Sequence, residues 1–266
     1  MTKNFICKEH YGIDDLLRIM QILRGEGGCP WDREQDHHTI RNNFIEETYE
    51  VIEAIDNDDC VLLQEELGDV LLQVVFHSQM EQEKDEFDFD DVCDGICQKL
   101  IHRHPHIFGD ITANSTEEVL KNWEAIKRVE KKQDTFSGTL EAVSRALPSL
   151  TRGFKVRKRA AKAGFCSSDT QHALDNLKAY VDRLEKAIAA GNADSISEKL
   201  GDVLFSVVDV SGSLKTDPEE ALYRSIDRFT DHFSNAEALA TARGDKLNEY
   251  SENERNAIWE AANKKE

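Results

Sequence analysis

The sequence predicts an all-α protein built from two tandem helical domains, and three observations predict it. Glycine and proline number only 14 and 4 among 266 residues, a low count for a protein built on turns and short strands. Apolar residues recur at helical intervals, and no alternating run bounded by turn residues indicates a sheet. A segment of the first half also repeats in the second half.

The repeat is clearest where Leu67–Val75 reads LGDVLLQVV and Leu200–Val208 reads LGDVLFSVV, with seven matches in nine at an offset of 133 residues. The tripeptide Trp-Glu-Ala also occurs twice, at 123–125 and 259–261. This long period is typical of a duplicated domain and not of a solenoid, whose repeats are about 20 to 50 residues long. We therefore predict one domain over 1–132, a polar linker over 133–147 and a second domain over 148–266.

Five helices are predicted in the first half, at Ile13–Leu23, Ile40–Asp56, Cys60–Gln82, Phe89–His102 and Glu117–Lys131. Glycines and Pro30 end the first of these helices, and Pro105 ends the fourth. The polar residues 57–59 form a short break between the second and third helices, which is typical of an αα-hairpin. The third helix is apolar nearly all round, so we expect it at the centre of a bundle or at a subunit interface.

The composition excludes several classes of partner. With 33 basic and 52 acidic residues, the formal charge is -19, so the surface repels duplex DNA and anionic membranes on average, whereas a cationic cofactor is easily accommodated. No apolar run approaches the roughly 18 residues that cross a bilayer, and the first ten residues lack the apolar stretch of a secretory signal. We expect a cytoplasmic protein whose six cysteines are structural thiols.

Four carboxylates of the predicted hairpin are arranged symmetrically about its turn. Glu50 and Glu66 are each eight residues from Asp58, and Glu47 and Asp69 are each eleven residues from it. At a rise of about 1.5 Å per residue, each pair lies at one height, roughly 12 and 16 Å from the turn. Residues three apart also share a helix face, so all four carboxylates can meet across one seam.

Such a cluster needs a counter-charge, because two unit charges 4 Å apart repel by about 4 kcal/mol at an effective dielectric constant near 20. An all-oxygen ligand set suits Mg²⁺ or Mn²⁺ better than zinc or copper. The simpler interpretation is that these glutamates form solvated helix faces. A di-iron bundle is a further alternative, but it expects two Glu-x-x-His pairs, and only Glu34 with His37 fits that spacing, before the second helix.

Several motifs together resemble the MazG family of nucleoside triphosphate pyrophosphohydrolases. They are GCPWDREQ (28–35), EETYEVIEAID (46–56), EELGDVLLQVVFH (65–77), HRHPHIF (102–108), WEAIK (123–127) and ALPSL (146–150). The resemblance implies an all-α fold with tandem four-helix-bundle modules, in which helices from two subunits form a homodimer. It implies that Mg²⁺ is held by Glu47, Glu50, Glu66 and Asp69, the residues that the turn symmetry selects.

The family activity implied for this chain is hydrolysis of a nucleoside triphosphate to a monophosphate and pyrophosphate, with tolerance of the base and a role in clearing damaged nucleotides. We expect Glu46, beside the ligands, to orient or deprotonate the attacking water, although it could equally be a solvent-facing charge. The substrate's phosphates require cations, and Lys99 and Arg103 share one helix face. Lys127 could join them, and Trp123 could stack on the base or lie in the core.

The second half departs from this pattern at the ligand positions. Through the offset of 133, Glu46, Glu47, Glu50 and Glu66 become Ala179, Tyr180, Arg183 and Lys199. Only Asp202 and the neighbouring Glu198 remain acidic. We therefore expect that the second half has lost hydrolysis while keeping its packing face. The alternative function, from a different class, is a non-catalytic helical regulator that binds a nucleotide or a protein.

Overall fold

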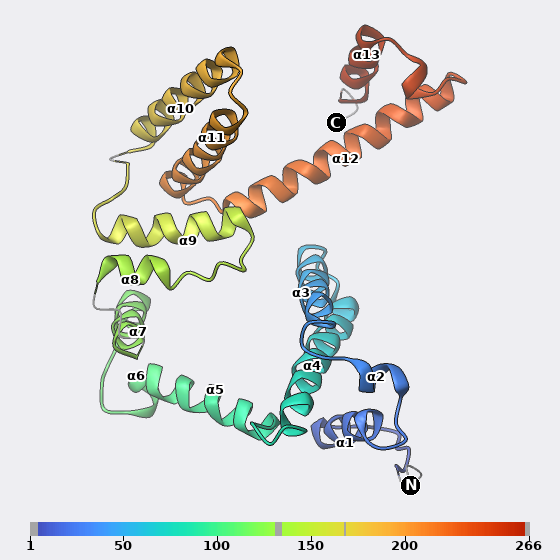
Figure 1. Cartoon of the computed structure of the whole chain (residues 1–266), viewed down its shortest axis with the longest axis vertical. Coiled ribbons are helices and arrows are strands. Elements are labelled where there is room, and N and C mark those ends of the chain that lie inside the picture. The colour runs from blue at the N-terminus through green and yellow to red at the C-terminus, as the bar shows by residue number, and fades with distance from the viewer. Residues whose placement is uncertain (1–4, 131–134, 168, 264–266) are drawn as a thin grey trace. The chain divides into compact units, whose positions relative to one another are not determined.

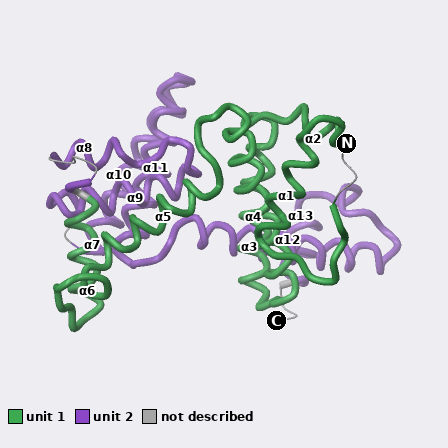
Figure 2. The backbone as a smooth tube through the Cα atoms, turned by 90° about the horizontal axis from the view of Figure 1, so that it is seen from below, with its two compact units in different colours: residues 1–127 green, residues 128–266 purple. Residues whose placement is uncertain are grey.

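The computed structural model describes residues 5–130, 135–167 and 169–263, and these ranges contain helices and no strand. The predicted all-α class is confirmed. The chain divides into two compact units, residues 1–127 and 128–266 (Figure 2). The predicted domain end at residue 132 lies outside the described residues, and the range predicted as a linker includes a helix, α8 (Phe136–Glu141).

In unit 1 the described helices are α1 (Ile13–Arg24), α2 (Pro30–Glu34), α3 (Arg41–Asp56), α4 (Cys60–Gln82), α5 (Phe89–Arg103), α6 (Pro105–Phe108) and α7 (Thr116–Glu130) (Figure 1). Five of them match the predicted helices to within one residue at each described end. Lys131, the predicted end of the last, lies outside the described residues. The two short helices α2 and α6 were not predicted. Each begins with proline, which fits the first turn of a helix because the missing N–H has no partner there anyway.

The turn between α3 and α4 is fixed by its own polar residues. Asp59 is the N-cap of α4, and its Oδ1 accepts hydrogen bonds from the backbone N–H groups of Val61 and Leu62, each at 3.0 Å. Asp58 takes the left-handed backbone conformation, with φ of 52°. The two helices therefore fold back on each other after only three residues, and α3 packs along α4.

The core of unit 1 lies where α1 packs against α4. The buried residues of this cluster are Met20, Ile40, Val75, Phe76 and Met80. Other apolar side chains of α4 are not covered, since Leu67 and Leu71 are 52% and 38% exposed. Helix α4 is apolar nearly all round, but unit 1 buries only part of its apolar surface.

In unit 2 the further helices are α9 (Ser149–Lys162), α10 (Thr170–Ala190), α11 (Ala193–Leu214), α12 (Pro218–Ala242), the 3₁₀ helix η1 (Leu247–Glu249) and α13 (Glu252–Asn263). The α10–α11 hairpin repeats α3–α4, and α9 packs on α11 as α1 packs on α4. A second cluster joins α12 to α13 through Ala236, Ala240, Ile258 and Ala262. No helix among the described residues combines the length and apolar character that a membrane span requires.

Candidate active site

Three of the four predicted carboxylates meet at one point in the α3–α4 seam. Glu47, Glu66 and Asp69 each offer a carboxylate oxygen, and these oxygens all lie within 4.8 Å of one another. Glu66 is buried, with 8% of its surface exposed, and the other two are half-buried. The mirrored spacing about Asp58 therefore does bring carboxylates of both helices together.

The fourth carboxylate, Glu50, interacts directly with this trio. Its carboxylate raises the pKa values of both Glu47 and Glu66, through hydrogen bonding and through charge repulsion. All four residues thus belong to one electrostatic unit.

The pKa values show how strongly the cluster resists full ionisation. Burial raises the pKa of Glu47 to about 6, assisted by its hydrogen bond to Glu50 and by the charges of Asp69, Glu50 and Glu66. Burial also raises the pKa of Glu66, together with the charges of Glu50 and Asp69. Convergent oxygens that repel each other in this way are a donor set suited to a hard divalent cation.

Glu46 lies outside the trio. It precedes Glu47 on α3, and its side chain is exposed. Successive helical residues point about 100° apart, so Glu46 lies at the border of the cluster and not within the seam.

Gln73 is a site feature that was not predicted. It lies one helical turn beyond Asp69 on α4, and only 6% of its surface is exposed. Its Oε1 is fully buried without a hydrogen-bond partner among the described residues. Buried amide oxygens are almost always hydrogen-bonded, so an orphaned one beside a polar cluster points to a missing donor. The symmetry about Asp58 could have found it, because Asn43 and Gln73 are each fifteen residues from that turn.

Two of the four predicted substrate-binding residues, Arg103 and Lys127, lie against the indole ring of a third, Trp123. The guanidinium carbon of Arg103 lies 5.7 Å from the ring centroid of Trp123, and the Nζ of Lys127 lies 5.2 Å from it. These distances are typical of cation–π contacts, by which α5 and α7 hold two positive charges close together. Lys99 lies one turn before Arg103 on α5 and is exposed. In the described part of unit 1, α7 does not pack against the α3–α4 hairpin, so the cations and the carboxylates form two separate groups.

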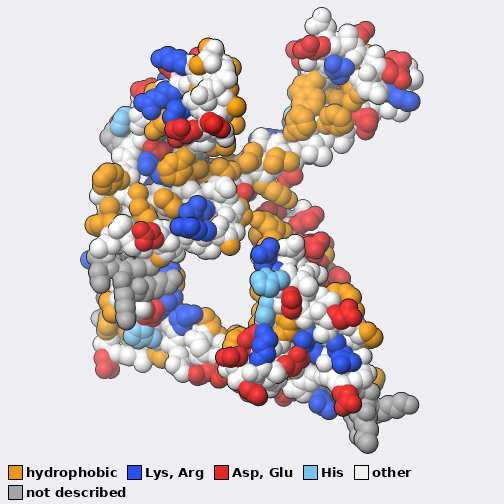
Figure 3. Space-filling view, in the orientation of Figure 1, with side chains coloured by type: hydrophobic (Ala, Val, Ile, Leu, Met, Phe, Trp, Pro, Cys, Tyr) orange, Lys and Arg blue, Asp and Glu red, His pale blue; other side chains and the backbone are white. Residues whose placement is uncertain are grey.

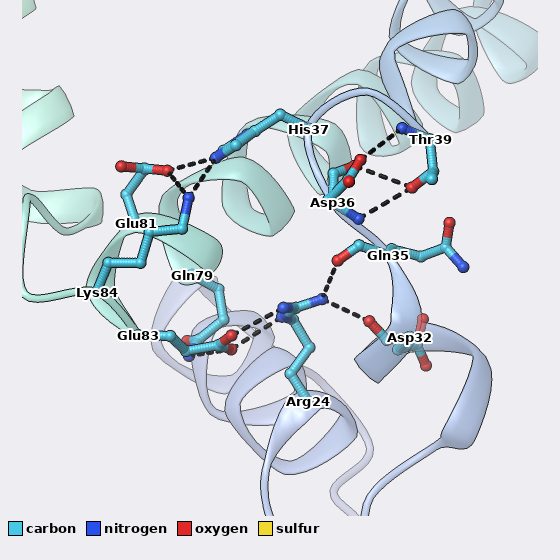
Figure 4. A network of polar contacts seen from close by, with 10 residues as sticks. All are labelled: Arg24, Asp32, Gln35, Asp36, His37, Thr39, Gln79, Glu81, Glu83 and Lys84. Atoms are coloured by element: carbon cyan, nitrogen blue, oxygen red, sulfur yellow. Dashed lines mark hydrogen bonds and ion pairs between the residues drawn. The ribbon is translucent and has the colours of Figure 1, made fainter.

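The segment that follows α1 is fixed by the buried side chain of Arg24 (Figure 4). Its guanidinium donates to both carboxylate oxygens of Glu83, each at 2.8 Å, and to the backbone carbonyls of Asp32 and Gln35. Arg24 thereby ties α2 to the end of α4. Neither partner could be identified from sequence spacing alone, because the Arg24–Glu83 pair spans 59 residues.

A histidine pair lies beside this network. The Nδ1 atoms of His37 and His77 are 2.7 Å apart and their rings are stacked, while His37 Nε2 contacts Glu81. Burial lowers the pKa of His77, and so does the charge of His37. These contacts hold the residues just before α3 against α4.

In the second half, cationic side chains occupy two of the equivalent ligand positions. Lys199, at the position of Glu66, has its Nζ 2.7 Å from an oxygen of Glu198 and 3.4 Å from one of Asp202. The hydrogen bond to Glu198 raises the pKa of Lys199. Arg183, at the position of Glu50, lies over the ring of Tyr180 at 4.9 Å. The ammonium group of Lys199 thus offsets part of the charge of Glu198 and Asp202, and no three potential metal ligands converge among the described residues of this half.

Comparisons with known proteins agree with the geometry. A MazG nucleotide pyrophosphohydrolase domain model matches residues 35–108, the range that holds all four carboxylates. The chain is 39% identical to a nucleoside triphosphate pyrophosphohydrolase of Escherichia coli, over 96% of this chain and 98% of that protein. It is 36% identical to a nucleoside triphosphate pyrophosphohydrolase/pyrophosphatase MazG of Thermotoga maritima, over 94% of each chain.

Among solved structures, a MazG-related protein from Thermotoga maritima is 28% identical and covers 44% of this chain and 99% of its own, with a TM-score of 0.38. Family membership follows from the near full-length relatives above and from the motifs that build the site. The chain belongs to the MazG nucleotide pyrophosphohydrolase family.

Proposed function

We propose that this chain is a Mg²⁺-dependent nucleoside triphosphate pyrophosphohydrolase, which converts a nucleoside triphosphate and water to the monophosphate and pyrophosphate. The observation that carries the proposal is the convergence of carboxylate oxygens of Glu47, Glu66 and Asp69 within 4.8 Å, in a member of this family. The names of the relatives from Escherichia coli and Thermotoga maritima support the reaction.

The metal site consists of Glu47, Glu50, Glu66 and Asp69, and their oxygen donors also suit Mn²⁺. When bound, a divalent ion in such a site offsets phosphate charge and lowers the pKa of a bound water. The protein's own part is to hold these carboxylates at fixed positions on two helices. Glu46, exposed at the border of the cluster, is the residue that orients or deprotonates the attacking water.

We propose that the cationic group around Trp123, which is separate from the carboxylate cluster within the described part of unit 1, takes part in phosphate binding. Arg103 and Lys127 lie over the indole ring, and Lys99 extends the group by one turn of α5. Because the indole ring holds two of these cations together, little side-chain entropy is lost when a polyphosphate binds. Trp123 then serves mainly to position cations, with base stacking as a second role.

We further propose that the chain forms a homodimer through the uncovered faces of unit 1. Large apolar side chains are exposed there on α3, α4 and α5, namely Ile45, Tyr49, Leu67, Leu71, Ile96 and Leu100. Hydrophobic side chains are also visible on the face that Figure 3 shows. A second copy that buries them would complete the bundle that α3 and α4 begin. Light scattering coupled to size exclusion tests this assembly.

The reaction is tested by its products. With Mg²⁺ and each common nucleoside triphosphate, the purified protein should release pyrophosphate and the monophosphate in equal amounts. Similar rates with the different bases would support broad base tolerance and a housekeeping role for the nucleotide pool. Release of orthophosphate instead would contradict cleavage between the α and β phosphates. Absence of any product would favour the non-catalytic regulator.

We also propose that the protein is cytoplasmic. All six cysteines are free thiols, which agrees with a reducing compartment.

A further inference from the structure

Each half has an arginine at the equivalent position of the helix that packs against its hairpin, but the two arginines have different surroundings. The offset of 133 residues that relates the two LGDV segments also relates Arg24 on α1 to Arg157 on α9. In the first half, sixteen residues (25–40) join α1 to α3, and they include α2. Carbonyl groups of this segment accept hydrogen bonds from Arg24 and enclose its guanidinium.

The second half lacks this covering segment. Only seven residues (163–169) join α9 to α10, and no helix corresponds to α2 among those described. Arg157 instead donates to Asp209, which stands where the first half has Phe76, and the Oγ of Ser167 donates to the other oxygen of Asp209 at 2.6 Å. A cavity of about 630 Å³ lies beside Arg157.

The cavity has an apolar wall and a cationic rim. Phe154 and Ala161 of α9 form apolar lining, and the end of α11 contributes Ser213. Lys158, on α9, and Lys215, at the end of α11, line the same cavity. Lys215 is held in the left-handed backbone conformation, with φ of 57°, which residues other than glycine rarely adopt and which costs stability.

The acidic residues of the cavity are already engaged, and the two lysine ammonium groups are not. Burial alone would raise the pKa of Asp209, but its hydrogen bonds from Arg157 and Ser167 and the charge of Arg157 hold that pKa below its ordinary value. Asp217 caps α12, where its Oδ1 accepts from the backbone N–H groups of residues 219 and 220. Among the described residues, the Nζ atoms of Lys158 and Lys215 make no ion pair and no hydrogen bond.

The walls of the cavity are firmly held. At the start of α9, both the backbone N–H and the Oγ1 of Thr151 donate to Glu219 of α12, at 2.9 and 2.8 Å. At its end, the N–H of Phe165 donates to the carbonyl of Ala160 at 3.0 Å. A cavity with fixed walls can bind a ligand without first paying for the ordering of its lining.

We propose that this cavity of the second half binds a phosphorylated small molecule, with its phosphate between Lys158 and Lys215 and its apolar or planar part against Phe154 and Ala161. The cavity volume lies within the range of about 300 to 1,000 Å³ that is usual for small-molecule sites. A mononucleotide combines both chemical parts, and pyrophosphate carries the phosphate chemistry alone. The inference goes beyond the proposed function, because no carboxylate of the first half takes part in it.

The test is equilibrium binding to the full-length protein in EDTA, by isothermal titration calorimetry with adenosine monophosphate, pyrophosphate and orthophosphate as separate probes. Without divalent ions, the carboxylate cluster of the first half repels phosphate, so binding there is suppressed. We expect saturable binding of the monophosphate that weakens with ionic strength. Equal affinity for pyrophosphate would assign the site to phosphate alone, and tighter binding of the monophosphate would assign a role to the apolar wall.

Three variants locate the site. Lys158→Glu should weaken binding by at least about tenfold, since a hydrogen bond to a charged group contributes that much or more. Lys155→Glu is the matched control, because Lys155 is exposed on the same helix and does not line the cavity. Lys215→Gly removes the second charge and also relieves the left-handed residue, so it should lose binding while its melting temperature stays equal or rises.

The proposal is overturned if none of the three probes binds saturably, or if Lys158→Glu and Lys155→Glu weaken binding equally. It is also overturned if Arg103→Glu, in the cationic group of the first half, abolishes binding in EDTA, because the site would then lie in that half. Failure of hydrolysis by the first half would leave these results unchanged, so the two proposals fail separately.

Discussion

Glu47 on α3 and Asp69 on α4 place carboxylate oxygens within 4.8 Å of each other, and each residue is eleven positions from Asp58 in the turn. The contact is thus set by the symmetry of the hairpin, and the turn is fixed by Asp59, whose carboxylate caps α4. Two helices that pack through their apolar side chains thereby bring like charges together. We therefore expect stability, proton binding and cation binding to be coupled at this point.

The first prediction concerns pH. The pKa of Glu47 is raised from 4.5 to about 6 in the folded protein, so its protonated form stabilises the fold below pH 4.5 and this contribution is lost as the pH rises through about 6. The metal-free protein should therefore become less stable between about pH 5 and about pH 7. Mg²⁺ competes with this proton, so the Mg²⁺-induced rise in melting temperature should grow over the same window.

Thermal scans in EDTA and in Mg²⁺ across this range check the prediction. Carboxylates with lowered pKa values, such as Glu83 and Asp209, titrate below the window and do not obscure it. Glu47→Gln should flatten the pH dependence of the metal-free protein. An equal slope in wild type and variant would assign the effect to other groups.

The second prediction concerns Glu50. Glu50→Gln removes one charge from the cluster, so the metal-free protein should melt at a higher temperature and Mg²⁺ should raise that temperature less than in wild type. Glu53→Gln is the matched control, since Glu53 is exposed one turn further along α3. An unchanged response to Mg²⁺ in Glu50→Gln would count against the metal site.

The third prediction concerns Arg24. Arg24→Met removes a buried guanidinium that donates to Glu83 and to two carbonyls of the α2 segment. We expect the free energy of unfolding to fall by about 2 kcal/mol, the usual magnitude for hydrogen bonds to a charged group. Urea denaturation measures it, with Arg18→Met, on the same helix, as the control that should change stability little. Equal losses in both variants would refute the anchoring role.

The sequence predicts the five main helices of the first half because each has an apolar face and a polar break at its end. The short helices α2 and α6 escape the same reasoning, since Pro30 and Pro105 can end one helix or begin another and the sequence does not distinguish these uses. Longer-range contacts, such as that of Arg24 with Glu83, depend on how α1 packs against α4 and leave no local pattern.

The grouping of the carboxylates could be predicted from the same short turn that predicts the hairpin. Sequence separation across a three-residue turn fixes the height of facing residues, so the spacing of Glu47, Glu50, Glu66 and Asp69 is enough to group them. Sequence separation does not predict which side chains are buried. Only the structure distinguishes the buried Gln73 from the exposed Gln64 on the same helix. The contacts of Arg103 and Lys127 with Trp123 also require the packing of α5 near α7.

The fourth prediction concerns Gln73. Its buried Oε1 has no partner among the described residues, so Gln73→Leu should leave the stability unchanged or raise it by about 1 kcal/mol. If the amide serves a substrate or its water, pyrophosphate release should fall by about tenfold or more in the same variant. Gln64→Leu, at an exposed position of α4, is the control. Loss of stability together with activity would indicate a purely structural amide.

The fifth prediction concerns Lys199, whose ammonium group lies between Glu198 and Asp202 in the second half. Lys199→Glu replaces two attractions by mutual repulsion, so the melting temperature in EDTA should fall. Adding Arg183→Glu restores a second acidic ligand position, and Mg²⁺ should then recover the lost stability. Lys178→Glu is the control, because Lys178 pairs with the exposed Asp175 on its own helix, and its melting temperature should not respond to Mg²⁺ beyond the wild-type response. Calorimetric titration of Mg²⁺ into the double variant should show an additional binding event. If the double variant gives the same titration curve as the wild type, the two cationic residues are not what prevents the second half from binding the ion.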